Sequence, residues 1–207
     1  MPAVAEAVMR TVLRDARHWA DRGFTFRVAM NCAPQELLDG KFLPLLFDAL
    51  DRADLPEDTL LVEVTEDTLL AHPDRARAAL QSLRAHHVQT AINAYGTGFS
   101  LLEDLEDLPV QELKIDRYFI ASLRDTARSR RIVQIATQRA HALGLRTVAV
   151  GVEDRDVASL LLPLGVDALQ GFHIARPMPA DEIAGWMRDW SSRTRALWSP
   201  GPCRPTA

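Results

Sequence analysis

Short apolar runs alternate with longer amphipathic stretches along the chain, and this alternation predicts an α/β fold. The stretches between the apolar runs repeat apolar residues three and four positions apart, which is helical spacing. We expect helices at 5–22, 35–51 (broken near Gly40 and Pro44), 75–87, 101–108, 127–143, 154–162 and 180–190. The apolar and β-branched runs are expected to form six strands, at 24–30, 60–65, 88–92, 113–116, 147–152 and 166–172.

A strand–helix alternation of this kind predicts parallel strands joined by right-handed crossovers. The strands are apolar nearly throughout, which is typical of a sheet covered on both faces. An open doubly wound sheet and a (β/α) barrel both fit this pattern. No Gly-x-Gly-x-x-Gly motif follows the first expected strand, so dinucleotide binding has no support. Residues 191–207 are rich in Pro, Ser and Arg, and we expect a disordered or loosely attached tail behind one domain, residues 1–190.

The composition and charge of the chain argue against several classes of protein. The chain has 207 residues, and its net charge of −4 argues against nucleic acid as the main partner. No apolar run reaches the roughly 18–20 residues that a membrane span needs, and the N-terminus does not resemble a secretory signal. The two cysteines give neither a disulfide framework nor a metal-binding motif. These features predict a globular cytoplasmic protein.

Polar residues follow or end every expected strand. Two of them are charges inside apolar runs, Glu63 between valines and Lys114 between Leu and Ile. Such charges are costly unless they are paired or serve a site. Buried ion pairs that fix the strand register would explain single positions, whereas a shared concave site at the carboxyl ends of the strands explains all six. The polar positions are Asn31, Glu63 with Glu66, Asn93, Lys114 with Asp116, Glu153 and Gln170.

Six ordered segments resemble the EAL domain, the cyclic-di-GMP phosphodiesterase family. Residues 28–37 resemble the family's SVNLSxxQL, and 63–66 (EVTE) resemble ELTE. The remaining segments are 93–100 (NAYGTGFS), similar to DDFGTGYS; 108–119 (LPVQELKIDRYF), similar to LPVDxLKIDRSF; 148–153 (VAVGVE), similar to VAEGVE; and 164–179 (LGVDALQGFHIARPMP), similar to LGCDxxQGYxFxRPLP. The resemblance implies an incomplete (β/α) TIM-like barrel of about six parallel strands, because the first family strands, with the Glu-Ala-Leu motif, have no counterpart here.

The resemblance also implies roles for individual residues. Asn31 and Glu63 stand at positions of metal ligands, and Lys114 stands near the attacking water. Glu66 stands where the family braces its glycine loop, here with Gly96 and Gly98. The ligand-binding positions are Gln170, Glu153, Lys114, Arg176 and Pro177.

The chain departs from the family at three carboxylates. The Asp-Asp pair that bridges two divalent cations is Asn93-Ala94, and a further Glu is Val150. Hydrolysis by this design needs two hard cations held by carboxylate oxygens. We therefore expect no enzymatic activity, with Lys114 and Glu153 as catalytic remnants. We also expect no cofactor beyond, at most, a single weakly held Mg²⁺.

Three functions are compatible with the family resemblance and the missing carboxylates. The domain is a cyclic-di-GMP receptor, a protein-interaction module, or a residual phosphodiesterase that gives linear pGpG. An interaction module would use the acidic residues Glu103, Asp104, Glu106 and Asp107 or the helix surface at 132–143. An incomplete barrel leaves unpaired strand edges, so we expect a protein partner, a homodimer, or a longer sensor protein of which this chain is a fragment.

Overall fold

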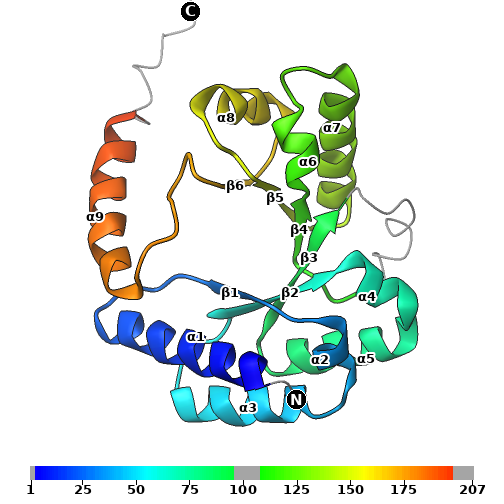
Figure 1. Ribbon diagram of the computed structural model, residues 1–207, viewed down its shortest axis with the longest axis vertical. Coiled ribbons are helices and arrows are strands. Elements are labelled where there is room, and N and C mark those ends of the chain that lie inside the picture. Colours follow the sequence, from blue (N-terminus) through cyan, green and yellow to red (C-terminus); the bar gives the residue numbers. More distant parts are fainter. Residues whose placement is uncertain (1–2, 96–107, 198–207) are drawn as a thin grey trace, which may run out of the picture.

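One parallel sheet forms the centre of the molecule (Figure 1). The computed structural model describes residues 3–95 and 108–197. Each strand in this part of the chain pairs with the next one in sequence, in the order β1-β2-β3-β4-β5-β6. The predicted α/β class and the six parallel strands are therefore confirmed. The strands are β1 (Val28–Asn31), β2 (Leu60–Thr65), β3 (Gln89–Tyr95), β4 (Glu112–Ile115), β5 (Arg146–Val150) and β6 (Ala168–Gln170).

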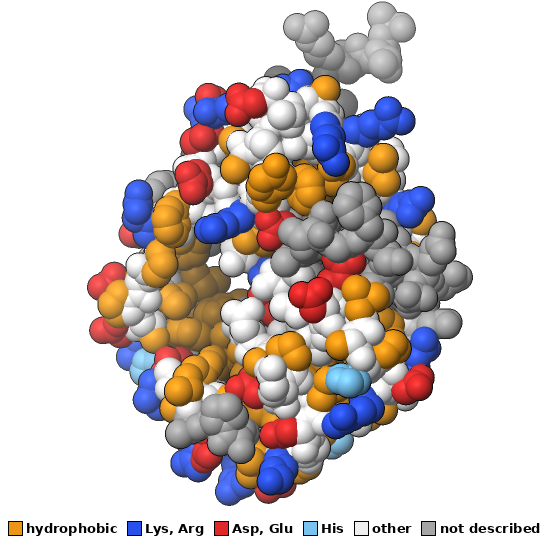
Figure 2. Space-filling model, turned by 45° about the vertical axis from the view of Figure 1, so that its right-hand side comes forward, with side chains coloured by type: hydrophobic (Ala, Val, Ile, Leu, Met, Phe, Trp, Pro, Cys, Tyr) orange, Lys and Arg blue, Asp and Glu red, His pale blue; other side chains and the backbone are white. Residues whose placement is uncertain are grey.

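The sheet curls without closing. Among the described strands, β1 and β6 each pair on one side only. The space-filling view shows one side of the molecule hollowed, with hydrophobic side chains on the walls of the hollow (Figure 2). The shape is that of an incomplete TIM-like barrel, as predicted.

Helices surround the sheet, and most of them begin and end within a few residues of the predicted positions. The expected helix at 35–51 is two helices, because the Asp39 side chain accepts hydrogen bonds from the amides of Lys41 and Phe42 at the break. The last helix continues to Leu197, past its predicted end at Trp190, and residues 198–207 of the expected tail lie outside the described residues. The helices are α1 (Ala3–Asp21), α2 (Pro34–Leu38), α3 (Phe42–Ala53), α4 (Glu66–Ala71), α5 (Pro73–Ala85), α6 (Arg117–Ala121), α7 (Ala127–Ala142), α8 (Arg155–Leu161), the 3-10 helix η2 (Leu162–Leu164) and α9 (Ala180–Leu197).

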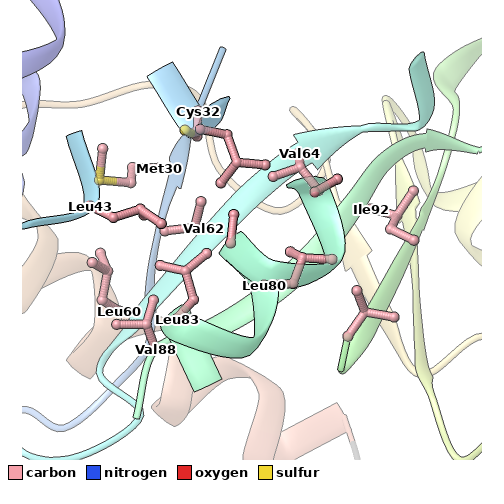
Figure 3. Close-up of a cluster of buried hydrophobic side chains, with 14 of the residues drawn as sticks. Met30, Cys32, Leu43, Leu60, Val62, Val64, Leu80, Leu83, Val88 and Ile92 are labelled. Carbon is pink, nitrogen blue, oxygen red and sulfur yellow. The ribbon is translucent and has the colours of Figure 1, made fainter. Parts of the chain in front are cut away.

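Two hydrophobic clusters lie between the sheet and its helices. The larger one fills the space between the first strands and the helices α3 and α5, and Figure 3 shows Val62, Leu80 and Leu83 within it. The smaller one joins the last strands to α6, α7 and α8 around Ile120 and Val133. Both clusters use alternate strand residues, which leaves the other face of each strand for the inside of the curled sheet. No helix in the described ranges combines the length and the apolar character that a bilayer crossing requires.

A polar contact ties α7 to the last two strands. The Asp167 carboxylate accepts hydrogen bonds from the Thr147 amide (2.7 Å), the Thr147 hydroxyl (2.8 Å) and the His141 ring (2.8 Å). Burial alone raises the pKa of Asp167, but the hydrogen bonds from His141 and Thr147 outweigh it and lower the pKa below its usual value. The carboxylate form is therefore the one that stabilises this corner of the fold.

Replacing Asp167 with Ala is expected to lower the free energy of unfolding by about 1–3 kcal/mol, because three donors lose a charged acceptor. Urea unfolding at neutral pH measures the loss, and Asp125→Ala, at an exposed position, is the matched control. Because folding lowers the pKa of Asp167, its carboxylate contributes its full stabilisation above the pKa that it has in the unfolded chain. This stabilisation is lost as the pH falls through the lower pKa of the folded state. Equal stabilities of the two variants would contradict this role.

Candidate functional site

Five polar side chains share the inner face of the curled sheet. Asn31 of β1 is the direct neighbour of Glu63 on β2, and Thr65 of β2 is the neighbour of Asn93 on β3. Side chains two residues apart on a strand lie on the same face, so Glu63, Thr65 and Asn93 face the same way. Lys114 of β4 joins them through the buried pair described next. Their neighbours Met30, Val62 and Ile92 point to the helices instead (Figure 3).

Contacts join four of these five side chains into one polar cluster: Asn31, Glu63, Asn93 and Lys114. The Lys114 ammonium donates a hydrogen bond to Glu63 Oε1, and both residues are buried, with 4% and 7% exposed. Asn93 Nδ2 donates to the other Glu63 oxygen, Oε2, over 3.1 Å. It also lies 3.4 Å from Asn31 Oδ1. Sequence reasoning placed these residues together, and the structure brings them into direct contact.

The buried ion pair is costly for folding. Removing an ammonium and a carboxylate from water costs several kcal/mol per ion, which their attraction offsets only with good geometry and further hydrogen bonds. Here Asn93 supplies the further hydrogen bond to Glu63. The Lys114–Glu63 ion pair lies at the carboxyl ends of parallel strands, which is where α/β barrel enzymes have their active sites.

The polar cluster has the donors for one hard cation. Turning the Asn93 amide over would point its Oδ1 toward Glu63 and Asn31, so that oxygens of all three side chains converge. Mg²⁺ is commonly bound by one or two carboxylates together with water and substrate phosphates, so one carboxylate and two amides fit a single ion. Among the described residues no three His, Cys, Asp or Glu form a group suited to a metal, so a cation at the polar cluster depends on the amide oxygens as well as on Glu63.

The ends of β5 and β6 place further predicted residues near one another. Val150 is the neighbour of Gln170, and the Gln170 carbonyl accepts hydrogen bonds from the amides of Gly151 and Val152. Gln170 is exposed, and its role in ligand binding stays a prediction. Glu153 is also exposed, just beyond β5. In the described part of the chain Glu153 makes no hydrogen bond to the polar cluster, so its role stays a prediction.

Gly171 sets the position of Gln170. A Cβ atom on Gly171 would lie 2.2 Å from the Val152 carbonyl oxygen and 2.4 Å from the Val152 nitrogen. Both are backbone atoms, which cannot move aside as a flexible side chain can. Only glycine lets β6 end this close to the end of β5.

The variant Gly171→Ala is expected to lose more than about 2 kcal/mol of stability, because the backbone around Val152 must shift. Gly185→Ala is the control, since Gly185 lies within α9 with nothing within 4 Å of its would-be Cβ. Alanine there is expected to be neutral or to stabilise by up to about 1 kcal/mol. Thermal unfolding of both variants checks the contrast, and a stable Gly171→Ala protein would disprove the close-approach argument.

An aromatic–cation pair lies beyond β6. The Arg176 guanidinium lies 4.9 Å from the centre of the Phe172 ring, and 51% of Phe172 is exposed. Arg176 and Pro177 were predicted as ligand-binding residues, and both are exposed. Sequence reasoning assigned Phe172 to a strand and did not consider it as a candidate site residue. Its place directly after Gln170 and Gly171, at the carboxyl end of a strand, was the available signal.

Several predicted features cannot be placed. Gly96, Gly98 and the acidic residues at 103–107 lie outside the described residues, and so does the side chain of Ala94. Glu66 is buried at the start of α4, 4% exposed, and its bracing of the glycine loop stays a prediction. Asp116, by contrast, has a structural role, because its side chain accepts a hydrogen bond from the Tyr118 amide (2.7 Å) and caps α6.

Known proteins are similar to this chain in sequence and in fold. The EAL domain profile matches residues 1–177. The chain is 35% identical over 181 residues to the bifunctional diguanylate cyclase/cyclic di-GMP phosphodiesterase MucR of Pseudomonas aeruginosa, covering 87% of this chain and 26% of MucR. It is 29% identical over 186 residues to the cyclic di-GMP phosphodiesterase PdeR of Escherichia coli, covering 90% of this chain and 28% of PdeR. The chain thus spans little more than a quarter of these relatives.

A solved structure matches as well. The MucR phosphodiesterase in complex with c-di-GMP superimposes with a TM-score of 0.84 at 35% identity, covering 87% of this chain and 73% of that chain. The curled sheet and its helices are therefore arranged like those of the MucR phosphodiesterase.

These comparisons overturn the expectation that the domain is not an enzyme. Relatives that match along most of the chain are named cyclic di-GMP phosphodiesterases. The expectation counted carboxylates at three positions, Asn93, Ala94 and Val150. It gave too little weight to the contacts among Asn31, Glu63, Asn93 and Lys114, which keep an ammonium, a carboxylate and two amides at one point of the sheet.

Proposed function

Because the chain belongs to the EAL domain family, we propose that it hydrolyses cyclic di-GMP to the linear dinucleotide pGpG. The observation that carries the proposal is the polar cluster of Asn31, Glu63, Asn93 and Lys114 at the carboxyl ends of neighbouring strands. Relatives named for this activity, and a solved neighbour bound to this nucleotide, support the choice of substrate.

Substrate binding has two parts. The exposed Phe172 ring and the Arg176 guanidinium above it offer a stacking surface for a guanine base. The exposed amide of Gln170 adds a hydrogen-bond donor and an acceptor on the same side of the site. The phosphates then face the polar cluster, where the Lys114 ammonium attracts them.

A divalent cation fits the oxygens of Asn31, Glu63 and Asn93, and when bound it supplies Lewis-acid activation and neutralises phosphate charge. The protein side chains do the remaining work. Without a cation, Glu63 accepts hydrogen bonds from the Lys114 ammonium and from the Asn93 amide. With a cation bound, the Asn93 amide would be turned over, and Glu63 would still hold the Lys114 ammonium in place before substrate arrives. Lys114 stabilises negative charge as a water oxygen bonds to phosphorus and the P–O3′ bond breaks. The oxygen of the water stays on phosphorus as part of the new 5′-phosphate, and a proton of that water goes to the leaving 3′ oxygen, which becomes the ribose hydroxyl.

Calorimetric titration with cyclic di-GMP, combined with chromatography of the mixture, tests the proposal. The titration is run with Mg²⁺ or Mn²⁺ and with excess EDTA. We expect saturable binding and formation of pGpG with the cation, and loss of product with EDTA. Binding heat without product would refute hydrolysis and would identify a receptor. Neither heat nor product would refute both.

A further inference from the structure

A second aromatic side chain is exposed at the same end of the sheet as Phe172. Among the large hydrophobic side chains that the described chain leaves substantially exposed, two are aromatic, Tyr118 (70%) and Phe172 (51%). Both follow the carboxyl end of a strand, since Tyr118 belongs to α6 just after β4 and Phe172 comes directly after β6 and Gly171. The stacking surface described above uses Phe172 and leaves Tyr118 without a role.

The strand register places these two aromatic residues at one rim of the sheet. Both β4 and β6 pair with β5, and continuing the β4 register by one residue puts Asp116, Val150 and Gln170 in one row. Tyr118 and Phe172 each come two residues beyond this row. Neighbouring strands are about 4.8 Å apart, so the β4 and β6 positions of the row are separated by about 10 Å. The two residues therefore lie near one another, with the end of β5 between them.

Gly151 brings the start of α6 against the end of β5. A Cβ atom on Gly151 would lie 2.7 Å from the Cβ of Arg117, the first residue of α6. The Gly151 amide also donates a hydrogen bond to the Gln170 carbonyl over 2.8 Å. In Figure 1, α6 lies beside β5. One glycine thus contacts both the helix that carries Tyr118 and the strand that leads to Phe172.

Two contacts hold Tyr118 while its ring stays exposed. The Asp116 carboxylate accepts a hydrogen bond from the Tyr118 amide over 2.7 Å. The Tyr118 ring packs edge-on against the ring of Phe119, with 5.4 Å between the ring centres, and Phe119 itself is buried. An aromatic ring that is held in this way offers a stacking surface at little further cost in side-chain ordering.

We propose that Tyr118 stacks on the second guanine base of cyclic di-GMP, so that the site has one aromatic subsite for each base. The inference rests on the proposed function, in which Phe172 with Arg176 binds the first base. The nucleotide carries its two guanines on one ring of two riboses and two phosphates, so the bases extend to different sides when the phosphates face the polar cluster. Residues 108–119 are similar to LPVDxLKIDRSF, which has Ser at the position of Tyr118, so this second subsite belongs to the chain and not to the family pattern.

Substitutions of Tyr118 test the second subsite. Tyr118→Ala is expected to raise the Kd for cyclic di-GMP and the KM for its hydrolysis about fivefold or more, because a base loses its stacking partner. The kcat should change less than about threefold, since the contact is made equally before and during the reaction. Tyr118→Phe keeps the ring and should bind within about twofold of the original chain. Calorimetric titration gives Kd, and initial rates of pGpG formation with Mg²⁺ give KM and kcat.

Leu162→Ala is the matched control. Leu162 has 60% of its surface exposed and belongs to η2, which precedes the amino end of β6 and so lies away from the rim that carries Tyr118. Its loss removes exposed apolar surface of similar size and should leave Kd and KM unchanged. Circular dichroism confirms that each variant is folded.

A fluorescent analogue reports the stacking contact itself. A cyclic dinucleotide with 2-aminopurine in place of both guanines loses fluorescence when its bases stack on aromatic rings. At saturating protein, Tyr118→Ala is expected to relieve part of this quenching and Phe172→Ala another part, and the double variant should relieve both. A purely structural role of Tyr118 would not change the fluorescence of the bound analogue in this way.

Four results would overturn the inference. They are Tyr118→Ala with the Kd and KM of the original chain, Tyr118→Phe as weak as Tyr118→Ala, equal weakening by Leu162→Ala, and unchanged quenching in Tyr118→Ala. Each of them leaves hydrolysis by the original chain intact, and so refutes the second subsite without refuting the proposed function. An original chain that neither binds nor hydrolyses cyclic di-GMP would refute both.

Discussion

Replacing Glu63 with Gln is expected to lower the rate of cyclic di-GMP hydrolysis by about 1,000-fold or more, because one change removes several functions. The variant loses the carboxylate that pairs with Lys114 and that accepts from Asn93. It also loses the single charged oxygen donor of the polar cluster. Chromatographic detection of pGpG, at equal concentrations of folded protein, measures the effect.

Glu57→Gln is the matched control for this variant. Glu57 is a surface carboxylate with 75% of its side chain exposed, 3.5 Å from His87 and outside the polar cluster. Its loss should leave the hydrolysis rate within about twofold of the original protein. If Glu63→Gln retained the full rate, the polar cluster would not be the catalytic site.

Lys114→Met is expected to give the largest loss of stability, about 3–5 kcal/mol, because it leaves the buried Glu63 carboxylate without its cation. The double variant E63Q/K114M replaces the pair with a neutral amide and an apolar chain. It should recover most of the lost stability, because no unpaired charge is then buried. Urea unfolding of the two variants and the original protein measures both differences.

The activity of the double variant separates stability from catalysis. We expect it to fold nearly as well as the original protein and to form no pGpG. Recovered activity in E63Q/K114M would show that the pair serves folding alone. An equally unstable double variant would show that the cost of Lys114→Met comes from packing and not from the unpaired charge.

The periodicity of apolar residues predicted the fold. It did not predict every helix or where each helix and strand begins and ends. Alternation of strands and helices depends on local burial, which the sequence shows directly. The break between α2 and α3 depends on the Asp39 side chain and on Gly40 with its φ of 72°, and the sequence pattern placed it correctly. The short helices α4 and α6 were missed, because α4 begins directly after β2 and a single residue, Asp116, separates β4 from α6, so no loop in the sequence marks where either helix starts.

The sequence predicted which residues gather in the polar cluster, but not the contacts that they make there. The polar residues at the strand ends identified Asn31, Glu63, Asn93 and Lys114 as one group, because parallel strands end at one edge. Sequence comparison position by position could not show that Asn93 hydrogen-bonds to Glu63 across the sheet. Nor could it show the Arg176–Phe172 contact, which depends on how the chain turns after Gly171.

The most direct test of the account is a single-turnover reaction, with the chain in excess over radiolabelled cyclic di-GMP in the presence of Mg²⁺. We expect labelled pGpG to accumulate with time, to stop forming when EDTA is added, and not to form with the Glu63→Gln chain. Labelled nucleotide that stays cyclic at the rate of the protein-free reaction would contradict it.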